Sequence, residues 1–195
     1  IDMDTSDVDR WKEVLKHYEA VMEALQKPDL VSMDDFYRRE LPDLLRGREP
    51  GAYITKGELY RLMQWKLRRG KWRPRLLSFV SDLRDDAVRD CSRKAFSSLP
   101  DISKAVSELT VLKGVGPATA SAVLAAFSPD IVPFMSDEAM EAVIGDSKDY
   151  SLKRYTMFVD KIQAKAKELS TSEDPFQPSD VERALWCSSV GAKLG

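Results

Sequence analysis

The segment LTVLKGVGPATASAVLAAF, residues 109–127, contains the sharpest turn signal in the chain. Two glycines flank one valine, and a proline follows ahead of a run of small helix-forming residues. Glycine tolerates positive φ, so the backbone can reverse direction there without a Cβ clash. Proline at the first position of a helix sacrifices no hydrogen bond. We therefore expect one helix to end near Lys113, another to begin at Pro117, and a tight hairpin between them.

The rest of the chain has the same helical character. Apolar residues recur at spacings of three and four, the pattern of amphipathic helices. The pattern predicts helices over about 4–27, 32–45 (interrupted near Pro42), 55–69, 75–83, 85–97, 102–112, 117–127, from 137 onward, 151–169 and 179–189. Thr55 and Glu58 form a capping box that opens one helix, and Gly70 ends it. No alternating strand pattern occurs, so we predict an all-α fold.

The composition is that of a folded protein. Hydrophobic residues make up 43% and charged residues 32% of 195 positions, which suits one domain or two small lobes sharing a core. We treat 1–195 as a single domain and expect a monomer. No long apolar run and no signal-peptide pattern is visible, which predicts an intracellular protein without a membrane, with a nuclear location as an open alternative.

Metal and cofactor sites are not expected. The two cysteines, Cys91 and Cys187, lie far apart in helix-like segments and are too few for a thiolate-rich metal site. The single histidine, His17, lies in a polar helical stretch, where we expect it to face solvent.

One segment departs from the overall charge balance. The net charge is −2, yet residues 61–75 carry no acid and seven basic residues: Arg61, Lys66, Arg68, Arg69, Lys71, Arg73 and Arg75. A cluster of this density favours a polyanion or an acidic partner. The alternatives are a solvated rim, pairing with the surplus acids, or a nuclear-localisation signal.

The hairpin is a candidate anion site. Backbone N–H groups beside the positive end of a helix can hold a phosphate, and a DNA phosphate there would be bound without sequence readout. The alternative is a plain turn whose small residues let the following helix pack closely.

The hairpin pattern, Leu-x-Gly-Val-Gly-Pro-x-Thr-Ala, resembles the helix-hairpin-helix of DNA repair glycosylases. The resemblance continues in FSPDIVPFMSDEAMEAV, where Asp137 stands at the position of the family's catalytic aspartate. The spacing Pro-x-x-x-Asp is similar to that of the bacterial alkyladenine glycosylase branch. The match is specific over about residues 100–145 and extends by helix order over about 50–170.

The resemblance implies a helix-hairpin-helix, DNA-glycosylase-like bundle that binds DNA and removes a flipped, damaged base during base-excision repair. Asp137 would be the catalytic carboxylate. A phosphate would be held by Lys113, Gly114, Val115, Gly116, Ala118 and Thr119. The basic helix and turn at 55–75 would supply a second DNA surface through Lys66, Arg68, Arg69, Lys71, Arg73 and Arg75.

Two departures from the family narrow the chemistry. Bifunctional members carry a lysine nucleophile at the position of Ala118, so Schiff-base lyase chemistry through that residue is excluded. The four-cysteine cluster of many members is also absent. What remains is a monofunctional, water-using reaction.

Three aromatic residues, Tyr53, Trp65 and Trp72, are candidates to line a base pocket, or in the case of the tryptophans to stack on a base. The alternative for Trp65 and Tyr53 is a place in or at the edge of the core. For Asp137 the alternative is that Ser136 or Asp137 merely caps the following helix. Together these alternatives describe a non-catalytic module that binds nucleic acid or an acidic protein.

Overall fold

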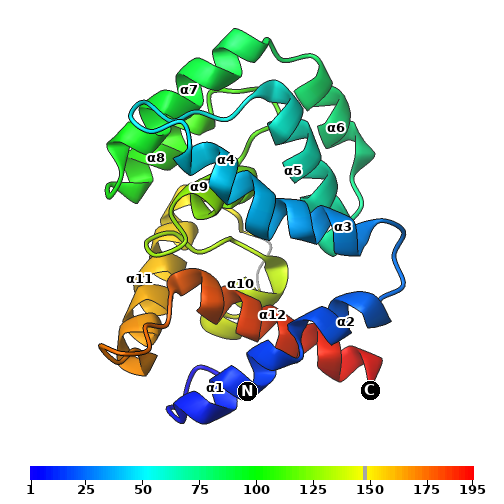
Figure 1. The fold of residues 1–195 in the computed structure, drawn as a ribbon, viewed down its shortest axis with the longest axis vertical. Helices are drawn as coiled ribbons and strands as arrows, with labels where there is room; N and C mark the ends of the chain where they lie inside the picture. The colour runs from blue at the N-terminus through cyan, green and yellow to red at the C-terminus, as the bar shows by residue number, and fades with distance from the viewer. Residues whose placement is uncertain (147–148) are drawn as a thin grey trace.

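The computed structural model describes residues 1–146 and 149–195, and every regular element in these ranges is helical (Figure 1). The elements are α1 (Val8–Lys16), α2 (Tyr18–Ala24), α3 (Leu30–Asp35), the π-helical turn η1 (Phe36–Glu40), α4 (Leu41–Arg46), α5 (Lys56–Arg69), α6 (Pro74–Ser81), α7 (Asp85–Ser98), α8 (Ile102–Leu109), α9 (Pro117–Phe127), α10 (Asp137–Ile144), α11 (Leu152–Leu169) and α12 (Pro178–Leu194). The all-α prediction is confirmed.

The capping signals in the sequence act as predicted. The Thr55 hydroxyl accepts from the Glu58 amide, and the Glu58 carboxylate accepts from the Thr55 amide, so the capping box opens α5. A further cap is Asp101, which opens α8 by accepting a hydrogen bond from the Lys104 amide. The helix α9 begins at Pro117 and ends at Phe127, as the hairpin pattern predicted.

Two predicted helices differ in detail. The N-terminal helix starts at Val8 and is capped by Asp7. It is divided in two at His17, which ends α1 and directly precedes the first residue of α2. The second predicted helix is irregular just before Pro42, but the backbone stays helical there. A π-helical turn, η1, directly precedes α4, and this local widening of the helix accommodates the missing N–H of the proline.

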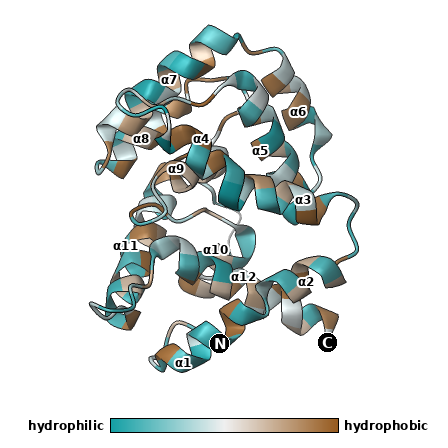
Figure 2. Ribbon diagram, viewed as in Figure 1, coloured by the Kyte–Doolittle hydropathy of each residue, from teal (hydrophilic) through white to brown (hydrophobic). Residues whose placement is uncertain are grey.

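Figure 1 shows two groups of helices, with α3 to α9 in one part and α1, α2 and α10 to α12 in the other. The helix α12 packs against α1, α2, α10 and α11, while α9 packs against α4, α5 and α8. The buried hydrophobic side chains of both parts form one cluster. Most helices carry both hydrophilic and hydrophobic residues (Figure 2), and in the described part of the chain none is long and apolar enough to cross a membrane.

A buried ion pair joins the two groups of helices. Arg69, at the end of α5, donates to both carboxylate oxygens of Glu182 on α12, at 3.0 and 3.1 Å. The side chains are only 2% and 4% exposed. Burial is the largest effect on the pKa of Arg69 and lowers it, but Glu182, Tyr18 and Asp34 together outweigh burial and raise that pKa above its usual value. The Ser136 hydroxyl also donates to Glu182, at 2.8 Å, so the start of α10 is tied to the same pair.

Replacing Glu182 by alanine leaves a buried, uncompensated guanidinium, and we expect it to lower the free energy of unfolding by about 3–5 kcal/mol. Urea denaturation measures this loss. The matched control is Asp90→Ala, which removes the partner of the exposed Arg93 and is expected to cost less than about 1 kcal/mol. Equal, small losses for both variants contradict the assignment.

Candidate functional site

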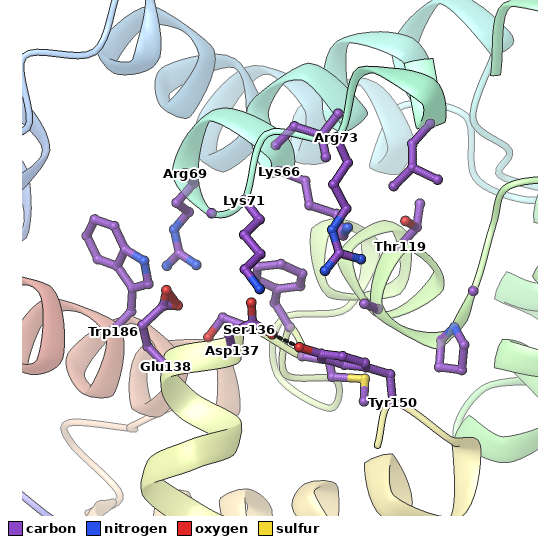
Figure 3. A pocket seen from close by; sticks show the side chains of 18 of the residues that line it. Lys66, Arg69, Lys71, Arg73, Thr119, Ser136, Asp137, Glu138, Tyr150 and Trp186 are labelled. Atoms are coloured by element: carbon purple, nitrogen blue, oxygen red, sulfur yellow. Dashed lines mark hydrogen bonds between the residues drawn. The ribbon is translucent and has the colours of Figure 1, made fainter. Parts of the chain in front are cut away.

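A pocket with a volume of about 250 Å³ lies where α5, the hairpin and the start of α10 meet. Its wall comes from five separate stretches of the chain: Lys66, Leu67, Arg69, Gly70, Lys71, Arg73 and Leu76; Gly114, Gly116, Pro117, Ala118 and Thr119; Phe134, Met135, Ser136, Asp137 and Glu138; Tyr150; and Trp186. Figure 3 shows the cationic side chains reaching in from one side and Asp137 and Glu138 from the other. Three predicted features, the hairpin, the basic segment and Asp137, thus share one pocket.

The surrounding structure explains why one of the two hairpin positions is glycine, but not the other. Gly114 has φ +86°, and a Cβ there would lie 2.6 Å from the Cβ of Phe79. Gly114 is therefore required by the turn and by its packing on α6. Gly116 has an ordinary φ of −97°, and a Cβ there would meet nothing within 4 Å. Backbone conformation and packing therefore explain the glycine at position 114, whereas neither requires a glycine at position 116.

The other hairpin residues predicted to hold a phosphate separate into two groups. Val115 is buried, and its amide already donates to the Leu112 carbonyl at 3.1 Å. Lys113 lies outside the pocket, with its ammonium 5.1 Å from the ring centre of Phe79. Ala118 and Thr119 do line the pocket, and their amides lie in the first turn of α9, where no intrahelical acceptor is available.

Asp137 is the first residue of α10 but not its cap. The cap is Ser136, whose hydroxyl accepts from the Ala139 amide at 3.3 Å. The Asp137 carboxylate instead faces the pocket and accepts a hydrogen bond from the Tyr150 hydroxyl at 2.6 Å (Figure 3). The capping alternative therefore applies to Ser136 and leaves the Asp137 side chain available for another role.

The hydrogen bond changes the acidity of Tyr150. The bond to Asp137 is the main reason, with burial second, that the pKa of Tyr150 rises to about 12. The phenol therefore remains protonated at neutral pH and keeps donating to the carboxylate. Next to Asp137, burial raises the pKa of the half-buried Glu138.

Three cations of the pocket have no acidic partner. Lys66, Lys71 and Arg73 line the pocket, and within residues 1–146 and 149–195 none of their side chains forms an ion pair or a hydrogen bond. Lys66 is half-buried, and burial, followed by the charge of Arg73, lowers the pKa of its ammonium. Their charges are available to a ligand.

Two arginines of the basic segment do have acidic partners: Arg61 pairs with Glu40 at 3.8 Å, and Arg69, which was predicted to belong to an exposed DNA surface, is buried. Arg69 lies in the core, paired with Glu182, and forms part of the floor of the pocket. Arg68 lies over the ring of Trp72, at 4.8 Å from the ring centre. Arg68 and Arg75 lie outside the pocket wall, and neither has an ion-pair partner in the described part of the chain.

The aromatic side chains of the pocket are not the predicted ones. Trp65 is 1% exposed and stacks on Tyr37 with ring centres 3.6 Å apart. Trp65 is therefore a core residue, which was the alternative to a place in the base pocket. Tyr53 lies among the guanidinium groups of arginines on neighbouring elements. Trp72 is 52% exposed, and none of the three lines the pocket.

The sequence missed Tyr150 and Trp186, which do line the pocket. Each lies far from the hairpin in sequence and follows no motif, so only the folded chain brings them to Asp137. In the part of the chain that the structure describes, no group of three or more His, Cys, Asp or Glu side chains is arranged to hold a metal ion.

The Tyr150–Asp137 bond predicts a specific titration. Tyr150 should ionise near pH 12 in the native protein, and Asp137→Asn should lower that midpoint toward the ordinary tyrosine value near 10 because the anionic acceptor is gone. The measurement is tyrosinate absorbance against pH, with the contribution of Tyr150 isolated by subtracting the matching Tyr150→Phe variant. An unchanged midpoint in Asp137→Asn contradicts the bond.

The chemistry of the pocket consists of a carboxylate held by a phenol, three unpaired cations and the N-terminus of a helix. No protein-family model, no curated protein and no solved structure matches the chain.

Proposed function

We propose that the protein binds DNA at this pocket and removes a flipped, damaged base by hydrolysis of the N-glycosidic bond. The observation that carries the proposal is the position of Asp137. Its carboxylate lies in one pocket with the hairpin glycines and with unpaired cations. A base-removing site needs the same elements, because it must hold the phosphate backbone while a carboxylate acts on the sugar.

The charge distribution supports a polyanionic ligand. Some arginines elsewhere in the chain, among them Arg39, Arg48 and Arg89, have carboxylate partners. Lys66, Lys71 and Arg73 have none within the described residues, although the chain as a whole is acidic. Unpaired cations around a concave site attract phosphates, and their neutralisation releases the counterions that drive DNA binding.

The hairpin supplies the complementary grip on the backbone. The amides at the start of α9 point out of the helix without intrahelical acceptors, and the helix dipole favours an anion there. Because Gly116 has no Cβ, a phosphate oxygen can approach the backbone at this point. Such contacts position DNA without reading its sequence.

The reaction follows from the charge that develops as the base leaves. Departure of the base leaves positive charge on the sugar, and a nearby carboxylate stabilises that charge or orients the attacking water. The hydrogen bond from Tyr150 fixes the orientation of the Asp137 carboxylate. Since Ala118 carries no amine, the hairpin offers no nucleophile for lyase chemistry, and the proposed reaction is monofunctional.

The second candidate is a non-catalytic module that only holds nucleic acid or an acidic partner protein. The net charge of −2 favours this alternative, because a dedicated DNA enzyme is commonly more basic. The Tyr150–Asp137 bond would then be a structural contact between α10 and the segment that follows it.

Single-turnover assays separate the two candidates. Wild type and Asp137→Asn are incubated with duplexes that carry a panel of modified bases, and abasic sites are scored by alkaline cleavage. We expect release of at least one base by the wild type and a loss of about 100-fold or more in Asp137→Asn, with DNA binding retained. The control is Asp160→Asn, which removes an exposed carboxylate on α11 and should leave the rate unchanged.

Failure of the wild type to release any base while it still binds DNA supports the non-catalytic module. A wild type that neither binds DNA nor releases a base overturns both forms of the proposal.

Alanine substitutions at the two hairpin glycines test whether the hairpin holds a phosphate or only packs against neighbouring helices. Gly116→Ala should leave thermal stability unchanged, because its Cβ meets nothing within 4 Å, but should weaken duplex binding. Gly114→Ala should lower stability, because it combines positive φ with a Cβ 2.6 Å from Phe79. Thermal unfolding and duplex titration give both quantities. Wild-type affinity in Gly116→Ala would assign the hairpin to packing alone.

A further inference from the structure

Lys66 differs from the other two pocket cations that have no acidic partner. Lys71 and Arg73 lie on the turn after Gly70 and are exposed, whereas Lys66 lies in the last turn of α5 and is half-buried. Figure 3 shows its side chain extending from α5 into the pocket. The exposed pair suits phosphates of a bound backbone, but that role does not explain why a third, half-buried amine lies deeper in the wall.

The surroundings of Lys66 favour its uncharged form. Burying an ammonium that has no partner costs free energy, so burial, followed by the charge of Arg73, lowers the pKa of Lys66, while Asp137 acts in the opposite direction. The other titratable side chains of the pocket wall are Arg69, Lys71, Glu138 and Tyr150. A larger share of Lys66 is therefore uncharged than of an exposed lysine, and the uncharged amine is the nucleophile that forms Schiff bases with carbonyl groups.

The proposed reaction produces a carbonyl group in the same pocket. Hydrolysis of the N-glycosidic bond leaves a hydroxyl on C1′ of the sugar, and this hemiacetal is in equilibrium with an open chain that carries an aldehyde at C1′. Asp137, which would act at this carbon, lines the pocket together with Lys66. The hairpin contributes no amine, because position 118 is alanine, but α5 brings one to the pocket in which the aldehyde would form.

From these observations we infer that Lys66 captures the abasic product as a reversible Schiff base, a role that rests on the proposed base removal at Asp137. The Lys66 nitrogen forms a double bond to C1′, and both protons of the uncharged amine leave with the carbonyl oxygen as water. Water reverses the step and releases the product. No phosphate ester breaks, so base removal remains monofunctional. The ligand class is an aldehyde flanked by phosphates, and Lys71 and Arg73 are placed to hold the phosphates.

The test supplies a duplex with a ready-made abasic site, so that the protein does not have to remove a base first. The full chain is incubated with this duplex and sodium cyanoborohydride, which reduces an imine to a stable secondary amine. We expect one covalent adduct between protein and DNA with both DNA strands intact, and peptide mass spectrometry should place it on Lys66. No adduct, or an adduct on any other amine of the chain, overturns the inference.

Two variants of Lys66 separate capture from a purely electrostatic role. Lys66→Arg keeps the positive charge but does not form the imine, so it should lose the adduct and still bind the abasic duplex. Lys66→Met keeps an unbranched apolar stem and should lose the adduct as well, and thermal unfolding verifies that both variants fold. The matched control is Lys161→Arg, an exposed position on α11 outside this pocket, and it should leave the yield of adduct unchanged. Wild-type yield in folded Lys66→Arg overturns the inference.

Failure of the capture and failure of the proposed function give different results. Release of a modified base by the wild type, without any adduct on the abasic duplex, overturns only the capture. An adduct on Lys66, without release of any base, supports the capture of abasic sites and overturns only the proposed base removal. A wild type that binds neither duplex overturns both.

Discussion

The arrangement of the functional residues depends on the buried pair between Arg69 and Glu182. The pair crosses from α5 to α12 and so joins the two groups of helices. Such a pair contributes little net stability compared with apolar packing, yet breaking one partner is costly because the other charge stays buried. Its role is therefore to fix one relative position of the two groups, and the pocket lies where they meet.

The same pair sets the position of the candidate catalytic carboxylate. Glu182 accepts from Ser136, and Ser136 caps α10, so the first residue of that helix is held at a defined place. That residue is Asp137, and Tyr150 restrains its carboxylate from the other side. Arg69 is followed directly by Gly70, which ends α5 and begins the turn that carries Lys71 and Arg73. One buried contact thus positions both the carboxylate and the cations that face it.

Local signals made much of this structure predictable. Helical periodicity, the Thr55 capping box and Pro117 determine where helices begin, because each acts within one or two turns of the chain. The burial of Arg69 was not predictable in the same way. It lies in a run of cations that indicates an exposed surface, and its partner is 113 positions away. Trp186 was missed for the same reason, because α12 must pack beside the pocket to bring it there. Tyr150 was missed because it lies between α10 and α11, where no helical pattern indicates which way a side chain points.

Some residues of the hairpin are explained by the fold alone, and others are not. Gly114 fits the hairpin motif, but positive φ and its contact with Phe79 already account for it, so its presence does not distinguish a phosphate site from a packed turn. Val115 is similarly explained by burial. Gly116 and the unpaired cations have no such explanation, because the fold would accept an alanine in place of the former and gains no ion pair from the latter. Gly116, Lys66, Lys71 and Arg73 are therefore the residues that most strongly indicate a ligand, because the fold does not require them.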